Sequence, residues 1–371
     1  MHRHTGVLII PVLLTWLAGI ATAASGTTCN ATTLCPASAP CCSEFGFCGD
    51  DSFCLGGCNP FASHSVDSCR PSPICEDATF TFPDNSRILS NADYFEGNAS
   101  EYDWVVNKGN IMNTNSSGGE LVLTLTEENG GTRLSSTRYV YYGTISAKLK
   151  TGKWGGVVTA FITMSDIKDE IDWEFPGTHT TQGQTNYFWQ GVIPTDKTNG
   201  KTTTESLSDT FSNYHTYTID WQQDQLKFLI DGKNQQTVKK SDTIDSNGVA
   251  HYPSTPSRIQ LSLWPAGTDD QAPGTVQWAG GMIDWNDPDY KAAGHFYATV
   301  QSVEVKCAPV LKPSPNDTSY LYSNSSDHSS PTITLSNHST LLNSAPIDGV
   351  SGMHGMVVGL IALFLAFVHL F

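Results

Sequence analysis

The stretch Asp169–Phe175, with the sequence DEIDWEF, decides the fold class of this chain and indicates its chemistry. From Glu170 onward, acidic residues alternate with large apolar residues, and this period of two predicts a half-buried β-strand rather than a helix. Alternate side chains of a strand share one face, so Glu170, Asp172 and Glu174 are expected to project together. The isoleucine and the two aromatic residues between them would then enter a core.

Three acids on one strand face repel one another, and this crowding raises the pKa of at least one carboxyl group. Retaining cleavage of a glycoside requires such a pair, an ionised nucleophile and a protonated acid about 5–5.5 Å apart. Strand spacing places the backbones of Glu170 and Glu174 roughly 13 Å apart, so their side chains must lean inward over Asp172 or the sheet must curve. The alternatives are an acidic, solvated strand face or a cation site.

Composition indicates a secreted all-β protein. The 371 residues include only 15% charged residues and 10% aromatic residues, whereas helix-rich proteins carry more Lys, Glu and Ala. The formal net charge of −16 argues against nucleic acid as a binding partner and against electrostatic docking on anionic membranes. We expect a monomer without a cofactor or a metal site.

Residues 1–23 are typical of a secretory signal peptide, with Arg3 before an apolar run and an A-x-A cleavage site at residues 21–23. A transmembrane helix is the alternative, but Pro11 interrupts the run. The mature chain is therefore expected in an oxidising compartment, where its ten cysteines would be paired.

Nine of the ten cysteines lie between residues 29 and 75, in a segment too short for a hydrophobic core of its own. The run CCSEFGFCG at residues 41–49 resembles the hevein-like chitin-binding module of carbohydrate-binding family 18, assigned here to residues 24–60. That resemblance implies a platform for N-acetylglucosamine, on which sugar rings stack against aromatic faces. Its members would be Ser43, Phe45, Phe47 and Phe53. The alternative is that the phenylalanines fill a miniature core.

The same resemblance implies three disulfides, Cys29–Cys42, Cys35–Cys48 and Cys41–Cys54. Cys58–Cys69 would then close a linker at residues 61–76. Cys75 and Cys307 remain, and a bond between them would join the two ends of the next domain. Spacing alone does not determine this connectivity.

Residues 77–310 contain short alternating runs separated by turn residues, a pattern typical of a β-sandwich or barrel. No nucleotide-binding, zinc-protease or serine-hydrolase motif occurs in this region. The expected strands include Glu120–Thr126, Thr144–Lys150, Thr216–Gln222, Lys227–Ile230 and Arg258–Trp264.

The composition changes again at residues 311–343, which are rich in Ser, Thr, Asn and Pro and are expected to form an extended, glycosylated stalk. Residues 344–371 end in an apolar run and are typical of a GPI-attachment propeptide, with Asn343 as the first choice for the anchored residue and Ser344 as the second. A plain tail anchor is the alternative. N-glycosylation sequons occur at Asn30, Asn98, Asn115, Asn316, Asn324 and Asn337.

Asp169–Phe175 resembles the strand motif of glycoside hydrolase family 16. The segments LSLWPAG at residues 261–267 and GTVQWAGG at residues 274–281, together with the order of the parts, resemble the fungal Crh transglycosylases within that family. The resemblance implies a jelly-roll sandwich in which Glu170 is the nucleophile, Glu174 the acid/base and Asp172 the residue that orients the nucleophile. It also suggests sugar contacts at Trp264 and Thr275, with Asn186, Tyr187 and Trp278 as further candidates.

The function implied by the resemblance is transfer of chitin onto β-glucan in the cell wall, with the protein held at the plasma membrane or wall by a GPI anchor. Two alternatives remain. One is a hydrolase of the same fold acting on chitin or β-glucan, and the other is a non-catalytic wall protein that binds chitin.

Overall fold

The computed structural model describes residues 26–91, 95–115, 118–194, 198–203, 207–323 and 327–342. The predicted signal peptide, Asn343 and the predicted propeptide lie outside the described residues. Within those ranges, no helix has the length and apolar character needed to cross a bilayer.

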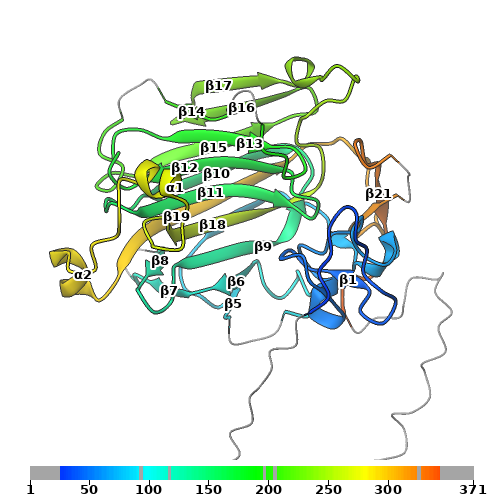
Figure 1. Ribbon diagram of the computed structural model, residues 1–371, viewed down its shortest axis with the longest axis horizontal. Helices are drawn as coiled ribbons and strands as arrows, with labels where there is room; N and C mark the ends of the chain where they lie inside the picture. Colours follow the sequence, from blue (N-terminus) through cyan, green and yellow to red (C-terminus); the bar gives the residue numbers. More distant parts are fainter. Residues whose placement is uncertain are drawn as a thin grey trace, which may run out of the picture.

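Two eight-stranded sheets form a sandwich, as Figure 1 shows, and the predicted all-β fold is confirmed. The first sheet has the order β17-β16-β15-β10-β19-β8-β7, and β4 also pairs with β19. Its strands are β4 (Ala78–Thr81), β7 (Asn110–Asn113), β8 (Leu121–Leu125), β10 (Gly143–Lys150), β15 (His215–Trp221), β16 (Gln225–Ile230), β17 (Lys233–Lys239) and β19 (Phe296–Cys307).

The second sheet has the order β14-β13-β12-β11-β18-β9-β6-β5. Its strands are β5 (Ile88–Leu89), β6 (Trp104–Lys108), β9 (Thr132–Val140), β11 (Val157–Ser165), β12 (Glu170–Pro176), β13 (Gln184–Phe188), β14 (Lys201–Thr202) and β18 (Ser257–Pro265). The helical segments of the described chain are short: α1 (Pro273–Trp278), α2 (Pro288–Ala293) and the 3-10 turns η1 (Asp51–Cys54), η2 (Val66–Ser68) and η3 (Lys240–Thr243).

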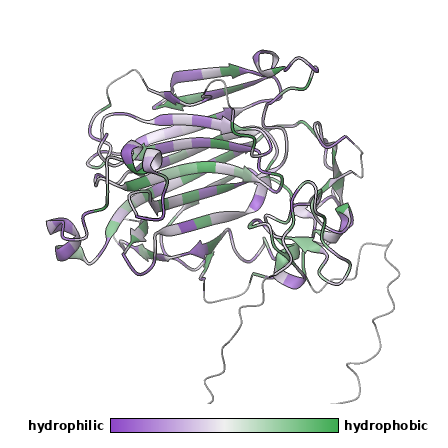
Figure 2. Cartoon of the chain, in the orientation of Figure 1, coloured by the Kyte–Doolittle hydropathy of each residue, from purple (hydrophilic) through white to green (hydrophobic). Residues whose placement is uncertain are grey.

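The core lies between the two sheets, and Figure 2 shows the alternating hydrophilic and hydrophobic bands that this arrangement requires. From β12, the core receives Trp173 and Phe175, both almost fully buried. The ring centroid of Phe175 lies 4.5 Å from that of Tyr217, and Trp173 meets Phe228 edge-on at 5.5 Å, both partners belonging to the first sheet. The odd-numbered face of β12 is thus in the core, which turns its three acids outward.

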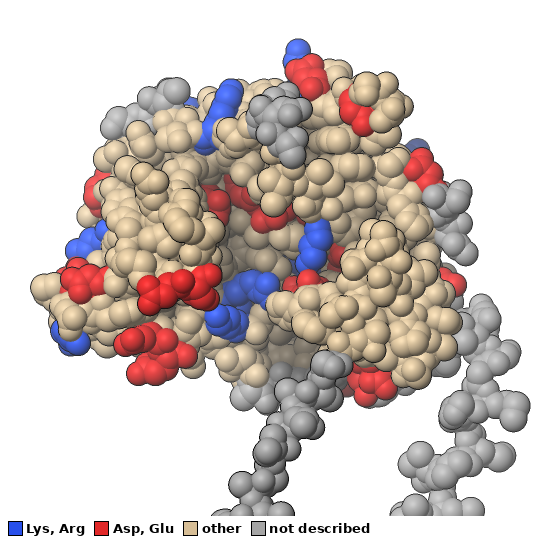
Figure 3. All heavy atoms as spheres, viewed as in Figure 1, with Lys and Arg blue, Asp and Glu red and all other residues tan. Residues whose placement is uncertain are grey.

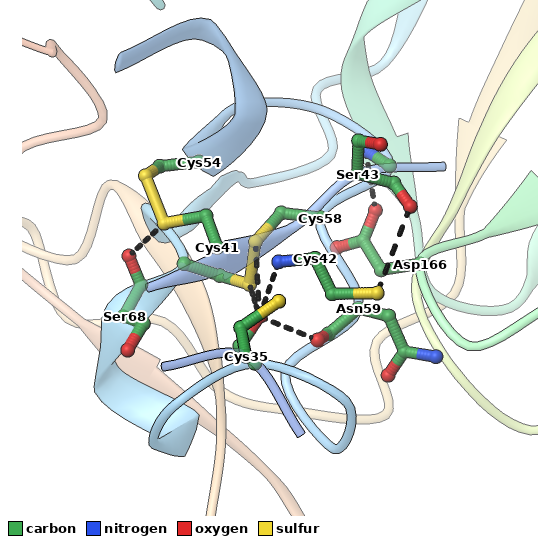
Figure 4. The surroundings of a disulfide bond; sticks show 12 residues. Cys35, Cys41, Cys42, Ser43, Cys54, Cys58, Asn59, Ser68 and Asp166 are labelled. Carbon is green, nitrogen blue, oxygen red and sulfur yellow. Dashed lines mark hydrogen bonds between the residues drawn. A yellow bond between two sulfur atoms is a disulfide. The ribbon is translucent and has the colours of Figure 1, made fainter. Parts of the chain in front are cut away.

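Crosslinks hold the N-terminal module, in which β1 (Cys41–Cys42) pairs with β2 (Cys48–Gly49). All ten cysteines are in disulfides, and the cystines supply the buried centre of the module (Figure 4). The structure has the three pairs that the resemblance implies, Cys29–Cys42, Cys35–Cys48 and Cys41–Cys54. It also has the two pairs expected for the remaining cysteines, Cys58–Cys69 and Cys75–Cys307. The last bond joins the segment before β4 to the end of β19.

The C-terminal tract differs from the expected extended stalk. Strands β20 (Ser319–Tyr322) and β21 (Ile333–Ser336) form a three-stranded sheet with β3 (Ser72–Pro73). Tyr320 and Ile333 are buried against Tyr139 of β9. The prediction of a stalk is therefore wrong for the described residues up to 342, because a few apolar side chains in a polar tract are enough to bind it to the sandwich.

Candidate active site

Strand β12 lies near the middle of the second sheet, between β11 and β13. Its start is fixed by Asp169, a buried carboxylate at the first position of the sequence motif. Asp169 Oδ1 accepts a hydrogen bond from the Gln190 backbone N–H at 2.9 Å. Its Oδ2 accepts from the Ser254 backbone N–H at 2.8 Å and from Thr255 Oγ1 at 2.7 Å. This anchor sets where the row of acids begins.

The three acids Glu170, Asp172 and Glu174 occupy alternate positions of β12 and face outward from the core. The side chain of Asp172 is hydrogen-bonded to that of Glu170. Oδ1 of Asp172 is buried and accepts no hydrogen bond from an N–H or hydroxyl group within the described part of the chain. The arrangement is the crowded, poorly solvated row that the alternation of the sequence predicts.

Burial is the main cause of the pKa shifts in this row. It raises the pKa of Glu174 to about 7, with a further contribution from the charge of Glu170. The pKa of Asp172 is raised well above its usual value by burial and then by both neighbouring glutamates. Burial also raises the pKa of Glu170, but the hydrogen bond from Asp172 and the charge of Lys168 oppose the shift. Their mutual hydrogen bond lowers the pKa of Glu170 and raises that of Asp172, so Glu170 is the more acidic member of this pair.

A cleft of about 530 Å³ opens beside Glu174 and brings together most of the predicted sugar contacts. Trp264 at the end of β18 and Trp278 at the end of α1 lie nearly parallel, with ring centroids 6.0 Å apart. Trp278 Nε1 donates a hydrogen bond to Gln184 Oε1 at 2.8 Å, so Gln184, which sequence reasoning missed, orients one wall. The other predicted residues that line the cleft are Thr275 and Asn186.

The predicted contact from Tyr187 is wrong. Tyr187 pairs with Ile171 across β12 and β13 and is buried in the core, whereas Asn186 pairs with Asp172 and shares its face. Two consecutive residues of a strand point to opposite faces, so the two could not both line the cleft.

Figure 3 shows a hollow in this face of the molecule, with acidic side chains on one side of it and basic side chains on the other. By its position in Figure 1, the acidic side lies over β12. The site is therefore an open cleft with aromatic and acidic walls.

Comparison with known proteins places the chain in a family. Residues 98–280 match the model for glycosyl hydrolases family 16. Crh-like protein 3 of Botryotinia fuckeliana is 40% identical over 302 residues, which are 81% of this chain and 66% of that protein. Congo red hypersensitive protein 2 of Saccharomyces cerevisiae is 39% identical over 335 residues, 89% of this chain and 70% of that protein. The chain belongs to the Crh-like proteins of glycosyl hydrolase family 16.

A solved structure agrees with this Crh-like assignment. The Crh5 transglycosylase in complex with NAG superposes with a TM-score of 0.57 at 28% identity, covering 75% of this chain and 100% of that one. The present Crh-like chain spans just under two thirds of the length of its Botryotinia relative.

The N-terminal module of this Crh-like protein presents its phenylalanines to solvent. The exposed fractions are 68% for Phe45, 44% for Phe47 and 36% for Phe53. With Ser43 they line a shallow depression of about 280 Å³. The alternative that these rings fill a miniature core is wrong, since the cystines occupy that place. Binding of chitin by this platform stays a prediction.

Proposed function

We propose that this protein is a retaining transglycosylase of the fungal cell wall that cleaves chitin and transfers the released chain to β-glucan. The observation that carries the proposal is the row of three acids on β12 at an aromatic cleft that Glu174 lines. Burial raises the pKa of Glu174 to about 7, while the hydrogen bond from Asp172 and the charge of Lys168 oppose the rise in the pKa of Glu170. The likeness to a Crh5 transglycosylase in complex with NAG supports the same class of reaction and a donor built from N-acetylglucosamine.

In the first step, the Glu170 carboxylate attacks the anomeric carbon of the donor while Glu174 protonates the departing sugar oxygen. The glycosidic bond breaks and an ester forms between the sugar and Glu170. Protonated Asp172 donates its hydrogen bond to Glu170, so the nucleophile is held ionised and oriented before the attack.

In the second step, Glu174 acts as a base. The charge of Glu170 contributes to the raised pKa of Glu174, and that charge disappears when Glu170 becomes an ester. The pKa of Glu174 therefore falls, and its carboxylate can accept the proton of an incoming hydroxyl. The acceptor oxygen then displaces Glu170 from the anomeric carbon, which restores the original configuration.

The nature of the acceptor separates transglycosylation from hydrolysis. The indoles of Trp264 and Trp278, whose planes are inclined by 26°, offer apolar faces on which a sugar ring stacks and from which it displaces water. A hydrolase of chitin or β-glucan would use the same three acids, and a non-catalytic chitin-binding protein would use only the platform of the module.

The place of action proposed here is the outside of the cell. Five disulfides suit an oxidising compartment. The sequence signals for secretion and for a GPI anchor at Asn343 complete the proposal of a protein attached to the plasma membrane or wall.

The test uses a chitin oligosaccharide as donor and a fluorescent laminarin-type oligosaccharide as acceptor. Products are separated by size, and new reducing ends are counted in the same reaction. Labelled hybrid products that disappear in Glu170→Gln and persist in the exposed control Glu128→Gln would support the transglycosylase. Shortened donor without labelled hybrids would identify a hydrolase, and two unchanged sugars would favour the non-catalytic protein.

A further inference from the structure

The N-terminal module is bound to the sandwich through Glu44, which lies between two members of its platform. The side chain of Glu44 is only 13% exposed. Its Oε1 lies 2.7 Å from a guanidinium nitrogen of Arg133 and its Oε2 lies 3.6 Å from one of Arg258. Its backbone carbonyl accepts a hydrogen bond from Lys168 Nζ at 2.9 Å. Three cations of the sandwich thus hold one residue of the module in place.

A second contact joins the backbone of the module to side chains of the sandwich. The Gly57 N–H donates a hydrogen bond to Asp166 Oδ1 at 2.9 Å, and Figure 4 shows Asp166 beside the crosslinked module. A Cβ atom added at Gly56 would lie 2.7 Å from a guanidinium nitrogen of Arg258. A side chain at this point would have to displace the Arg258 guanidinium, which also lies against Glu44. The module is therefore seated on the sandwich rather than joined to it only by the chain.

The arginines that hold Glu44 lie in register with the acids. Across the second sheet, Glu174 pairs with Ala160, Ala160 with Ser262, and Ser262 with Arg133. The two ends of this line are three strands apart, roughly 14 Å between backbones. Arg133, at the far end of the line that begins at Glu174, contacts Glu44 and lies near the ring of Phe45.

A parallel line runs from the nucleophile. Glu170 pairs with Met164, and Met164 pairs with Arg258. Both lines of side chains on the open face of the sheet thus lead from the acids to the residues that bind Glu44.

Phe45 stands at the junction between the module and this open face. Its ring is 68% exposed and the guanidinium carbon of Arg133 lies 5.8 Å from the ring centroid. Figure 3 shows the hollow of the sandwich open on this side, with the module at its flank by comparison with Figure 1. An exposed ring beside a cation at the end of a groove suits a sugar, whose C–H face stacks on the ring and whose hydroxyls accept from the guanidinium.

We propose that the module forms an outer wall of the cleft, so that a single N-acetylglucosamine chain occupies the acids and the Phe45 platform at once. The identity of the chain rests on the proposed function. Phe45 then extends the binding site, and long donors bind more tightly than short ones because the second contact is intramolecular. A module that served only as a separate wall anchor would show no such dependence on chain length.

The experiment measures the affinity and stoichiometry of chitin oligosaccharides by titration calorimetry on the full Glu170→Gln protein, which binds without turnover. A disaccharide is expected to occupy two sites per protein, and an octasaccharide one, with an affinity about 10²-fold higher. Phe45→Ala removes that gain, and Leu34→Ala, an exposed apolar residue of the module outside the platform, keeps it.

Glu44→Gln tests the contact between the module and the sandwich separately from binding of sugar by the module. Weakening the contacts to Arg133 and Arg258 is expected to reduce the gain with chain length while binding of the disaccharide is retained. Two octasaccharides bound per protein, or a length dependence unchanged by Phe45→Ala, would overturn the inference. Failure of the proposed function is distinguishable, because it removes transfer by the unmodified protein but leaves one-to-one binding of the octasaccharide intact.

Discussion

The pKa of Glu174 predicts how the reaction responds to pH. A carboxyl group with a pKa of about 7 is mostly protonated at pH 6, and only about a tenth of it is protonated at pH 8. If Glu174 is the general acid, kcat/KM for a chitin oligosaccharide falls about tenfold for each pH unit above 7, because only the protonated form assists departure of the sugar. An ordinary exposed glutamate would already be ionised two pH units lower.

The assay records initial rates of hybrid formation between pH 5 and pH 9 at fixed ionic strength. Glu174→Gln is expected to lower the rate by about 10²–10⁴-fold with a natural donor and to abolish the alkaline decline. With a donor whose aryl leaving group departs without a proton, the same substitution is expected to lower the rate much less. A rate that is flat or rises between pH 7 and pH 8.5, or equal losses with both donors, would refute the assignment of Glu174 as the acid.

Four further predictions follow from burial and packing. Asp172→Asn lowers the transfer rate but raises Tm at pH 7. A buried acid whose folded pKa is raised contributes stability that is fully present below its unfolded pKa and is lost as pH rises through the folded pKa. Between pH 4 and pH 8, the Tm of the parent is therefore expected to fall more than the Tm of the variant. Replacing Cys75 and Cys307 together by alanine opens a loop of 232 residues and costs up to about 5 kcal/mol in denaturant unfolding; a loss below about 1 kcal/mol would contradict this. Tyr320→Ala lowers stability by about 3 kcal/mol and speeds proteolysis after residue 311, which an extended stalk would not show. Trp264→Ala raises KM about tenfold with a smaller change in kcat, through loss of sugar stacking, whereas a fall in kcat alone would place the residue outside the binding wall.

The fold was predictable because period-two alternation is a local signal. The expected strands Thr144–Lys150 and Arg258–Trp264 agree with β10 and β18 to within one residue at each end. The acid face of β12 followed from the same rule. The same rule, had it been applied to Asn186 and Tyr187, would have excluded one of these two neighbours from the cleft.

Other features left no local signal. The seat of the module joins Glu44 to Arg133, Lys168 and Arg258, which are far apart in the chain. The packing of the C-terminal tract depends on single apolar residues such as Tyr320, and average composition hides them. Both are long-range contacts that depend on the finished sandwich, so patterning within a short window could not reveal them.

The two faces of β12 explain how the fold tolerates its active site. The row of one buried and two half-buried carboxyl groups disfavours the native state, since each has a raised pKa. The opposite face buries Trp173 and Phe175 almost completely. At about 25 cal/mol per Å² and 150–250 Å² per ring, each aromatic contributes roughly 4–6 kcal/mol as an upper estimate. Because one strand carries both faces, the burial that stabilises β12 also holds the acids in the low-dielectric position that keeps Glu174 protonated near neutral pH.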